Sequence, residues 1–312
     1  MDIKSKFLGS IIGSALGDSI GELAFNYHEK EELIKEINNR KAIRYTDDTA
    51  MVIGIAETII SNKGDWATED LGAQFHQNYK REPYRGYGLG PPMIFRTVER
   101  EHKKYQEVAE GLFGGDGSYG NGASMRIAPL GVFYYESKNI YEIAKRAAVA
   151  THTHPLGIDG AAILAKLISI LIPKDPDKFD IKQHEIEILT EIIEFAKTDE
   201  YKSKLSKIKD LLEKNADIID AEKIVGSNVL AFTSVPFSIF AFFRNPYSFK
   251  DALLDTVLVS RDRDTVGAMM SGLLGSFLGI NKIPKNWINK LENMEYIRQL
   301  ATSLYEIKKR EL

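Results

Sequence analysis

The stretch DRDTVGAMMSGLLGSFLG, residues 262–279, decides the fold that this sequence predicts. Its residues Gly267, Ser271, Gly275 and Gly279 recur at four-residue spacing, which places them on one face of a helix. Because each glycine inside a helix costs about 1 kcal/mol relative to alanine, a face of small residues indicates that another backbone approaches closely. We therefore expect this helix at the tightly packed centre of the molecule.

Helical periodicity extends over most of the remaining chain. Gly9, Gly13 and Gly17 repeat the small-residue pattern near the N-terminus. Apolar residues recur at helical spacing in residues 49–60, 140–150, 160–171, 186–196 and 296–307. Two β-rich pieces, 131–135 and 225–235, are isolated and have no hairpin signals beside them. The sequence therefore predicts an all-α fold, with amphipathic outer helices in the polar stretch 174–222.

Composition narrows the classes of protein. A chain of 312 residues allows one large or two ordinary domains, and 44% hydrophobic with 27% charged residues is typical of a globular protein. A net charge of -3 with no basic stripe argues against nucleic acid and favours a small-molecule or protein partner. The chain has no cysteine, so any metal is held by oxygen or imidazole.

The N-terminal apolar run, residues 7–17, is too short for a membrane span. Gly17 and Asp18 indicate the end of a packed helix and no signal-peptide cleavage site. We therefore expect a cytoplasmic protein. No exposed apolar stripe or heptad indicates an oligomeric state.

Two acidic motifs each precede a small-residue helix: TDDT at residues 46–49 and DRDT at residues 262–265. Helix capping accounts for a threonine or one acid at each position, but not for so many acids. If the two helix starts meet, four carboxylates converge and must bind protons or cations. Oxygen ligands favour Mg²⁺ or Mn²⁺, or Ca²⁺ in a larger ligand shell. A paired-metal site activates water, which predicts hydrolysis or group transfer.

Two glycine-rich segments offer main-chain N–H groups. The first glycine loop, RGYGLGPP at residues 85–92, is either an anion-binding loop or a tight surface loop. The second glycine loop, FGGDGSYGNG at residues 113–122, is either a connector or a wall whose aromatic rings face a nucleobase or ribose. His152, between two helices, is either a helix-dipole partner or a contact to a ligand phosphate or ribose.

Five segments in this order resemble the ADP-ribosylglycohydrolase family. They are GSALGD at 13–18, YTDDTA at 45–50, GNGASMR at 120–126, ATHTH at 150–154 followed by Gly157, and DRDTVG at 262–267. The resemblance implies a single domain over residues 1–312, folded as a compact orthogonal multi-helix bundle. It also implies hydrolysis of the glycosidic bond that links ADP-ribose to a protein side chain or a small acceptor.

The resemblance also implies a set of site residues. Two divalent ions, Mg²⁺ or Mn²⁺, would be held by Thr46, Asp47, Asp48, Asp262, Asp264 and Thr265. The two glycine loops are similar to those of the serine-ADP-ribose hydrolase branch, which implies ADP-ribose contacts from Gly86, Tyr87, Gly88, Gly90, Phe113, Gly117, Ser118, Tyr119, Gly120, Asn121 and His152. In this scheme Phe113 lies near adenine, and His152 lies near the ribose or a phosphate.

Three positions depart from the family pattern. Phe25 stands where many members have a flap glutamate that reaches the metals. Glu22 lies about one helical turn earlier and is the candidate replacement, while Glu29 lies on the other side. Glu22 and Asp262 are therefore the candidate catalytic residues for proton transfer. Arg261 and Arg263, at positions usually held by small residues, are expected to narrow the ribose pocket or to form salt bridges with the carboxylates. Two other readings remain open: an ADP-ribose or nucleotide sensor without turnover, and a metal-stabilised structural protein.

Overall fold

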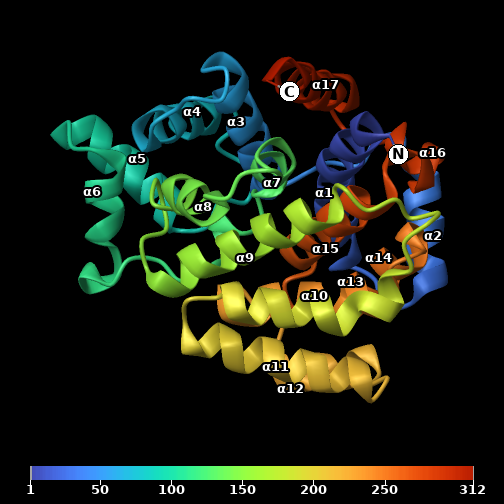
Figure 1. Ribbon diagram of the computed structural model, residues 1–312. Helices are drawn as coiled ribbons and strands as arrows, with labels where there is room; N and C mark the ends of the chain where they lie inside the picture. The colour runs from blue at the N-terminus through green and yellow to red at the C-terminus, as the bar shows by residue number, and fades with distance from the viewer. Residues whose placement is uncertain (1, 312) are drawn as a thin grey trace.

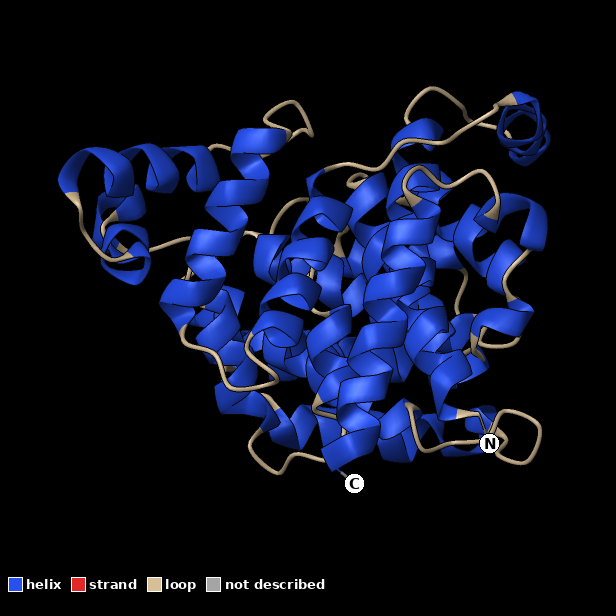
Figure 2. Cartoon of the chain, turned by 90° about the horizontal axis from the view of Figure 1, so that it is seen from above, coloured by secondary structure: helices blue, strands red, loops and turns tan. Residues whose placement is uncertain are grey.

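The computed structural model describes residues 2–311, which form 17 α-helices and no strand (Figures 1 and 2). The first nine helices are α1 Ile3–Ala24, α2 Lys30–Asn39, α3 Asp47–Ser61, α4 Thr68–Arg81, α5 Gly90–Glu101, α6 Tyr105–Glu110, α7 Ala128–Phe133, α8 Ile140–Ala148 and α9 Pro155–Leu171. The others are α10 Ile181–Phe195, α11 Asp199–Glu213, α12 Ile218–Val225, α13 Ala231–Arg244, α14 Phe249–Val259, α15 Arg263–Leu278, α16 Lys285–Ile288 and α17 Met294–Glu311. Short 3₁₀ helices are η1 Leu112–Gly115, η2 Asn121–Ala123 and η3 Ile280–Lys282. The predicted all-α class is confirmed.

Helices α1 and α15 pack against each other in antiparallel directions at the centre of the fold. A Cβ atom added to Gly9 would lie 2.5 Å from the carbonyl oxygen of Gly275, and one added to Gly13 would lie 2.7 Å from that of Ser271. Such distances leave no room for a methyl group, so the small residues allow the two backbones to touch. The small-residue faces predicted from the sequence are therefore the contact surfaces of the two central helices.

The helix that was expected to end at Gly17 and Asp18 continues to Ala24. The close contact with α15 also continues, because a Cβ atom on Gly21 would lie 2.2 Å from the carbonyl oxygen of Arg263. Asp18 is consequently fully buried in the middle of α1. The small-residue spacing continues at Gly21, four residues after Gly17, so Gly17 and Asp18 were the wrong marker for the end of the helix.

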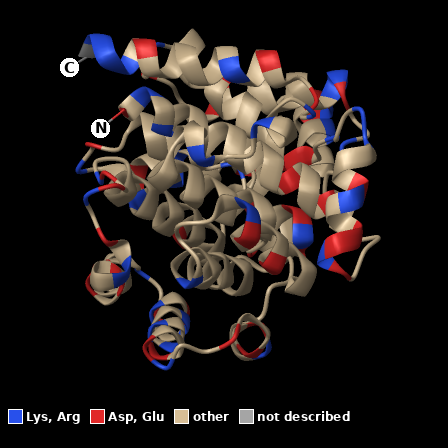
Figure 3. Cartoon of the chain, turned by 90° about the vertical axis from the view of Figure 1, so that its right-hand side faces the viewer, with Lys and Arg blue, Asp and Glu red and all other residues tan. Residues whose placement is uncertain are grey.

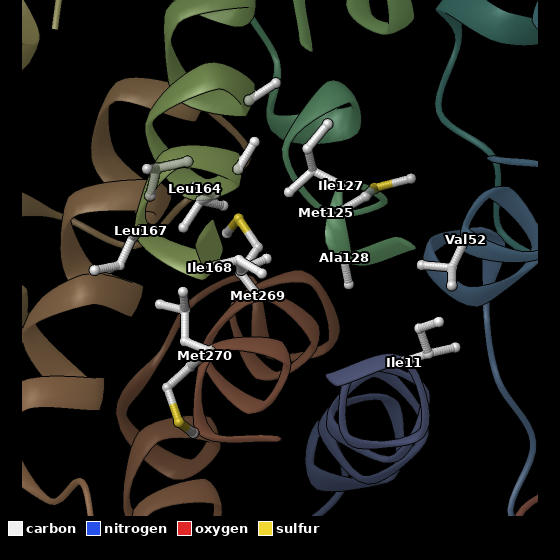
Figure 4. Close-up of a cluster of buried hydrophobic side chains, with 14 of the residues drawn as sticks. Ile11, Val52, Met125, Ile127, Ala128, Leu164, Leu167, Ile168, Met269 and Met270 are labelled. Carbon is white, nitrogen blue, oxygen red and sulfur yellow. The ribbon is translucent and has the colours of Figure 1, made fainter. Parts of the chain in front are cut away.

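The core surrounds the central pair. Figure 4 shows Ile11 of α1, Val52 of α3, Ile168 of α9 and Met269 of α15 in one cluster of buried side chains. Methionine is flexible and unbranched, so Met269 fills space that a branched side chain would leave empty. The packing fixes the first turns of α3 and α15 on the same side of α1.

Helices α10, α11 and α12 form an outer layer beneath α9 (Figure 1). Ile188 and Ile192 on α10 and Leu205 and Ile208 on α11 are buried toward the body of the protein. Lysine, arginine, aspartate and glutamate are concentrated on the outer helices (Figure 3). The amphipathic pattern predicted for this region is confirmed. None of the helices within residues 2–311 has the length and apolar character that crossing a bilayer requires.

Candidate active site

A cavity of about 480 Å³ lies where the first turns of α3 and α15 meet the two glycine loops. The predicted site residues that line it are Asp47, Asp48, Gly86, Gly88, Gly90, Phe113, Ser118, Tyr119, Gly120, Asn121, His152, Asp262, Asp264 and Thr265. Four predicted residues do not line it: Glu22, Thr46, Tyr87 and Gly117. Residues that line it without having been predicted are Met51, Leu89, Pro91, Gly122, Met125, Thr151, Val229 and Leu230.

The two acidic motifs meet at one end of the cavity, as the sequence predicts. Thr265 Oγ1 donates a hydrogen bond of 3.4 Å to Asp48 Oδ2, although the two residues are 217 positions apart. Thr46 caps α3 and is buried beneath the cavity wall, with its hydroxyl 3.0 Å from the same oxygen. We call Asp47, Asp48, Asp262 and Asp264 the acid cluster.

Burial and mutual repulsion dominate the electrostatics of the acid cluster. Loss of hydration, followed by the charges of neighbouring carboxylates, raises the pKa of Asp47 to about 8. The same causes raise the pKa of Asp262 to about 7 and that of Asp48 well above its ordinary value. Asp48 Oδ1 is buried and has no hydrogen-bond partner among the described residues. The cluster therefore favours bound protons or a cation over four free negative charges.

Asp18 supports the acid cluster from below, a role that the sequence analysis did not assign. Its carboxylate accepts hydrogen bonds of 3.0 Å from the main-chain N–H groups of Thr46 and Thr49. Both threonine hydroxyls also donate to it. Burial raises the pKa of Asp18 to about 7, although these hydrogen bonds oppose the increase. An acid within an otherwise apolar and small-residue helix is the sequence signal that identifies such a residue.

Asn121 connects the second glycine loop to the acid cluster. Its side-chain Nδ2 donates to Asp262 Oδ2 at 2.6 Å and to Ser234 Oγ at 3.1 Å. The amide thereby fixes one carboxylate oxygen of Asp262 and lowers the pKa of that group against the stronger effect of burial. Asn121 lines the cavity, and its side-chain amide, held by Ser234, positions Asp262.

Residues 227–231 join the two ends of the cavity through main-chain hydrogen bonds. Asn121 N donates to Val229 O at 3.0 Å, and Ala231 N donates to Tyr119 O at 3.1 Å. At the other end, Asp262 N donates to Ser227 O at 2.9 Å. This segment lies in the β-rich piece 225–235, which forms the end of α12, a loop with one isolated bridge, and the start of α13.

Several residues of the glycine loops have left-handed backbones. Gly86 has φ +91°, and a Cβ atom there would lie 3.8 Å from Asp47 Oδ1. Phe113 has φ +53°, lines the cavity and is 56% exposed as a residue. Gly117 has φ +72° and leaves space for Thr153, whose Oγ1 is 2.1 Å from the position of a Cβ atom. Tyr87 packs edge-to-face on Tyr79 at 5.1 Å, so its ring supports the loop.

His152 is buried against the cavity wall. Its Nδ1 lies 2.7 Å from Thr151 Oγ1. Burial, together with the positive charge of Arg126, lowers the pKa of His152 to about 3. The imidazole is therefore neutral at physiological pH.

The two arginines that depart from the family pattern do not pair with the acid cluster. Arg263 turns away from the cavity and donates to main-chain carbonyls at the end of α1, Ala24 O and Tyr27 O, the latter at 2.8 Å. Arg261 pairs with Glu222 at 3.1 Å. The expectation that these arginines narrow the pocket or bind its carboxylates was wrong, because helix-end carbonyls and Glu222 supply other acceptors.

The ADP-ribosylglycohydrolase family model matches residues 1–311, which is nearly the whole chain. The chain belongs to the ADP-ribosylglycohydrolase family. ADP-ribosylhydrolase ARH3 of Xenopus tropicalis is 30% identical over 342 residues, covering 97% of this chain and 95% of the relative. ARH3 of Homo sapiens is 26% identical, covering 97% and 93%. ADP-ribosylarginine hydrolase Tri1 of Serratia proteamaculans is 24% identical, covering 96% and 79%.

A solved structure, that of an ADP-ribosylglycohydrolase-related protein complex, superimposes with a TM-score of 0.70 at 20% identity. It covers 98% of this chain and 99% of its own. This likeness supports the fold of an ADP-ribosylglycohydrolase. The predicted family and its helical fold are thus confirmed.

Glu22 does not line the cavity. It is on the last turns of α1, where partial burial and the charge of Asp264 raise its pKa. Phe25, at the position of the flap glutamate, caps α1 and is 46% exposed. Within residues 2–311, no group of three or more histidine, aspartate or glutamate side chains is arranged so that it would hold a metal ion.

Proposed function

We propose that this chain is a metal-dependent ADP-ribosylhydrolase that cleaves the glycosidic bond between ADP-ribose and a protein side chain or a small acceptor. One observation carries the proposal: four carboxylates converge at one end of a cavity whose other walls are glycine-loop main chain and aromatic rings. The acid end has the groups needed for water chemistry at a sugar carbon. The other end has the shape and polarity needed for a nucleotide.

The glycine loops account for nucleotide binding. Gly86, Gly88 and Gly90 leave main-chain N–H groups accessible to a diphosphate, and Gly90 begins α5, where the helix dipole favours an anion. Phe113 and Tyr119 expose their rings at the cavity mouth, where an adenine or ribose can lie against them. These features match the chemistry of ADP-ribose from its base to its second ribose.

The donor set of the acid cluster fits hard divalent cations. Its carboxylates, with the hydroxyls of Thr46 and Thr265, provide only oxygen ligands, which suits Mg²⁺ or Mn²⁺. The unpartnered Asp48 Oδ1 is a buried oxygen that a cation would satisfy. Binding two ions would require these side chains to draw closer together. Such ions, when bound, lower the pKa of water and orient it toward an electrophilic carbon.

Asp262 is the best-placed group for proton transfer. Asn121 holds one of its oxygens, and the carboxylate lines the cavity, where in its ionised form it accepts a proton from water. A water oxygen forms a bond to the anomeric carbon while Asp262 accepts a water proton. The bond from that carbon to the acceptor nitrogen or oxygen breaks, and Asp262 passes the proton it took from water to the departing acceptor atom. The products are ADP-ribose and the unmodified acceptor.

The test is release of free ADP-ribose from serine-linked and arginine-linked substrates by the purified protein with Mg²⁺ or Mn²⁺. We expect release from at least one linkage and loss of at least 100-fold in kcat for Asp262→Asn, since removing a general base costs about 10²–10⁴-fold. The proposal fails if the substrates bind and none is hydrolysed.

A second candidate function is an ADP-ribose sensor without turnover. It is favoured by Phe25 at the flap-glutamate position and by the absence of Glu22 from the cavity wall. Calorimetry separates the candidates, because tight binding of ADP-ribose without hydrolysis supports the sensor. A purely structural metal site would instead raise the melting temperature with metal and give no further shift with ADP-ribose.

A further inference from the structure

Arg126 is a completely buried cation behind the cavity wall. Its guanidinium stacks on Phe75, 4.5 Å from the ring centroid, and Nη2 donates to Ala147 O at 3.1 Å. The same Nη2 donates to Thr151 Oγ1 at 2.8 Å. Within residues 2–311, these hydrogen bonds go to neutral acceptors and to no carboxylate. A buried charge held in this way is costly, so its contacts require an explanation beyond packing.

The hydrogen bond that Arg126 donates to Thr151 determines the direction of the hydrogen bond between Thr151 and His152. A guanidinium nitrogen only donates, so the Thr151 hydroxyl oxygen must accept from it. The single hydroxyl proton of Thr151 is then free to point at His152 Nδ1, 2.7 Å away. Because Nδ1 accepts this proton, a neutral imidazole must carry its own proton on Nε2.

The Nε2 atom of His152 faces the second glycine loop. A Cβ atom on Gly122 would lie 2.9 Å from Nε2, and one on Gly120 would lie 3.7 Å from it. Both glycines line the cavity, as His152 itself does. No hydrogen-bond partner for Nε2 lies within residues 2–311, which leaves this donor available to a molecule in the cavity.

We propose that Arg126 and Thr151 are positioning residues that hold His152 in the Nε2–H tautomer, as a neutral hydrogen-bond donor to an oxygen of the bound ligand. The identity of the ligand rests on the proposed function, in which the acceptor is a phosphate or ribose oxygen of ADP-ribose. The protonated Nε2 also has no lone pair for a metal ion. We call the hydrogen bonds from Arg126 through Thr151 to His152 the relay. The relay thus keeps the imidazole from binding a metal ion, so that the metal centre has oxygen ligands only.

Nitrogen-15 NMR of the imidazole side chains in the ligand-free protein tests the tautomer directly. The His152 signals are assigned by their loss in His152→Asn. We expect an unprotonated Nδ1 and a protonated Nε2 in the wild type and in Thr151→Ser, which keeps the hydroxyl. In Thr151→Val we expect the tautomer preference to weaken or reverse. A protonated Nδ1 in the folded wild type overturns the proposal, whatever the protein hydrolyses.

Calorimetry with ADP-ribose tests the consequence for binding. We expect Thr151→Val to weaken binding about fivefold, because a typical hydrogen bond contributes about 1 kcal/mol and 1.4 kcal/mol is tenfold. Thr151→Ser should stay within about twofold of the wild type, and Mg²⁺ affinity should change in neither variant. ADP, which lacks the second ribose, locates the acceptor: an equal loss with ADP indicates a diphosphate or proximal ribose oxygen, and no loss indicates the distal ribose.

Thr256→Val is the matched control. Thr256 is fully buried on α14 and donates to Ala252 O at 2.6 Å, away from the cavity. Its loss should lower stability without changing ligand affinity or the His152 signals. If Thr151→Val folds and binds ADP-ribose as tightly as the wild type does, the positioning role is wrong. If Thr151→Val does not fold, Thr151→Ser still tests the proposal. Normal ADP-ribose binding by Thr151→Ser, together with a protonated Nδ1 on His152, would contradict the positioning role.

Discussion

Gly17 and Gly267 occupy each other's missing side-chain space. A Cβ atom on Gly17 would lie 2.0 Å from the carbonyl oxygen of Gly267, and one on Gly267 would lie 2.4 Å from that of Gly17. Because both obstructing atoms belong to the main chain, rotating a side chain does not relieve the overlap. The separation of α1 and α15 therefore depends on a hydrogen atom, in place of a Cβ atom, at both Gly17 and Gly267.

This contact predicts that Gly17→Ala lowers the free energy of unfolding by about 3 kcal/mol, the upper range for an overpacked core. Urea denaturation measures the change. Gly272→Ala on α15 is the control, since its added Cβ atom would be 3.6 Å or more from its neighbours on α1 and α7. It should be neutral or should stabilise by up to about 1 kcal/mol through helix propensity. Equal losses for both variants would contradict the close contact as the cause.

The raised pKa values predict how metal-free stability depends on pH. The folded protein holds protons on Asp47 to about pH 8 and on Asp262 to about pH 7, whereas an unfolded aspartate loses its proton near its ordinary value. The folded state thus binds more protons between about pH 4 and pH 8, and stability falls as pH rises through this window. Melting curves in a chelator at several pH values measure this decrease.

Divalent metal should reverse that trend, because a cation replaces the protons. At a Mg²⁺ or Mn²⁺ concentration of 100 times Kd, stabilisation is about 2.7 kcal/mol, or about 4 °C in melting temperature for a chain of this size. The gain should be larger at pH 8 than at pH 5, and Asp47→Asn should reduce it. A gain that is independent of pH and of Asp47 would place the metal elsewhere.

Asp18→Ala is expected to damage both stability and metal binding. The substitution leaves the buried N–H groups of Thr46 and Thr49 without an acceptor, at about 1–3 kcal/mol for such a loss. It also frees the start of α3, so Mg²⁺ affinity should fall at least about tenfold, which corresponds to 1.4 kcal/mol. Denaturation and calorimetry measure the two effects.

Asp159 offers a control for this prediction. It is fully buried and accepts from Lys197 N, Thr198 N and the Thr198 hydroxyl at the start of α11, away from the cavity. Asp159→Ala should lose comparable stability and keep its metal affinity. A similar metal defect in both variants would show that general destabilisation is responsible.

Phe113→Gly is expected to separate stability from ligand binding. A left-handed backbone costs a residue other than glycine about 1–2 kcal/mol, and glycine loses some of this gain to unfolded-state entropy, so the variant should be stabilised by up to about 1 kcal/mol. Loss of the ring should weaken ADP-ribose binding by about 1–3 kcal/mol. Phe113→Ala should lose the same affinity without gaining stability. Calorimetry and denaturation distinguish these outcomes.

Glu22→Gln should retain activity within a few-fold of the wild type. Glu22 does not line the cavity, whereas Asp262 does and is held by Asn121. Steady-state kinetics on the linkage that the wild type cleaves provides the comparison with Asp262→Asn. A loss of kcat by Glu22→Gln as large as that by Asp262→Asn would assign proton transfer to Glu22.

Residue spacing predicted the helices well, because a buried helix face imposes its period on the sequence. Gly9 and Gly275 predicted the contact between the two central helices, because glycine lowers helix stability and is explained here by the close approach of two backbones. The end of α1 was misjudged because the four-residue spacing was followed only to Gly17, whereas Gly21 continues it for another turn. A capping pattern would have been needed to place Ala24 as the last residue.

The acid motifs were recognisable as parts of one site because two helix starts carried more acids than capping needs. Other features depend on tertiary structure. Arg263 donates to a carbonyl that the end of α1 brings to it, and Val229 accepts from Asn121 through its main-chain oxygen, which any residue provides. The identity of a residue does not predict a contact that its main chain makes.

Residues 227–231 connect the second glycine loop to the main chain at Asp262 through hydrogen bonds. A change in length at Val229 would shift Asn121 and the main chain at Asp262 together, because both are hydrogen-bonded to this segment. The second glycine loop and the acid cluster are therefore expected to change position together. A new substrate preference acquired at one end has to be accommodated by the other, so loop grafting between relatives should succeed only when residues 113–122, 226–231 and 260–265 are exchanged as a set.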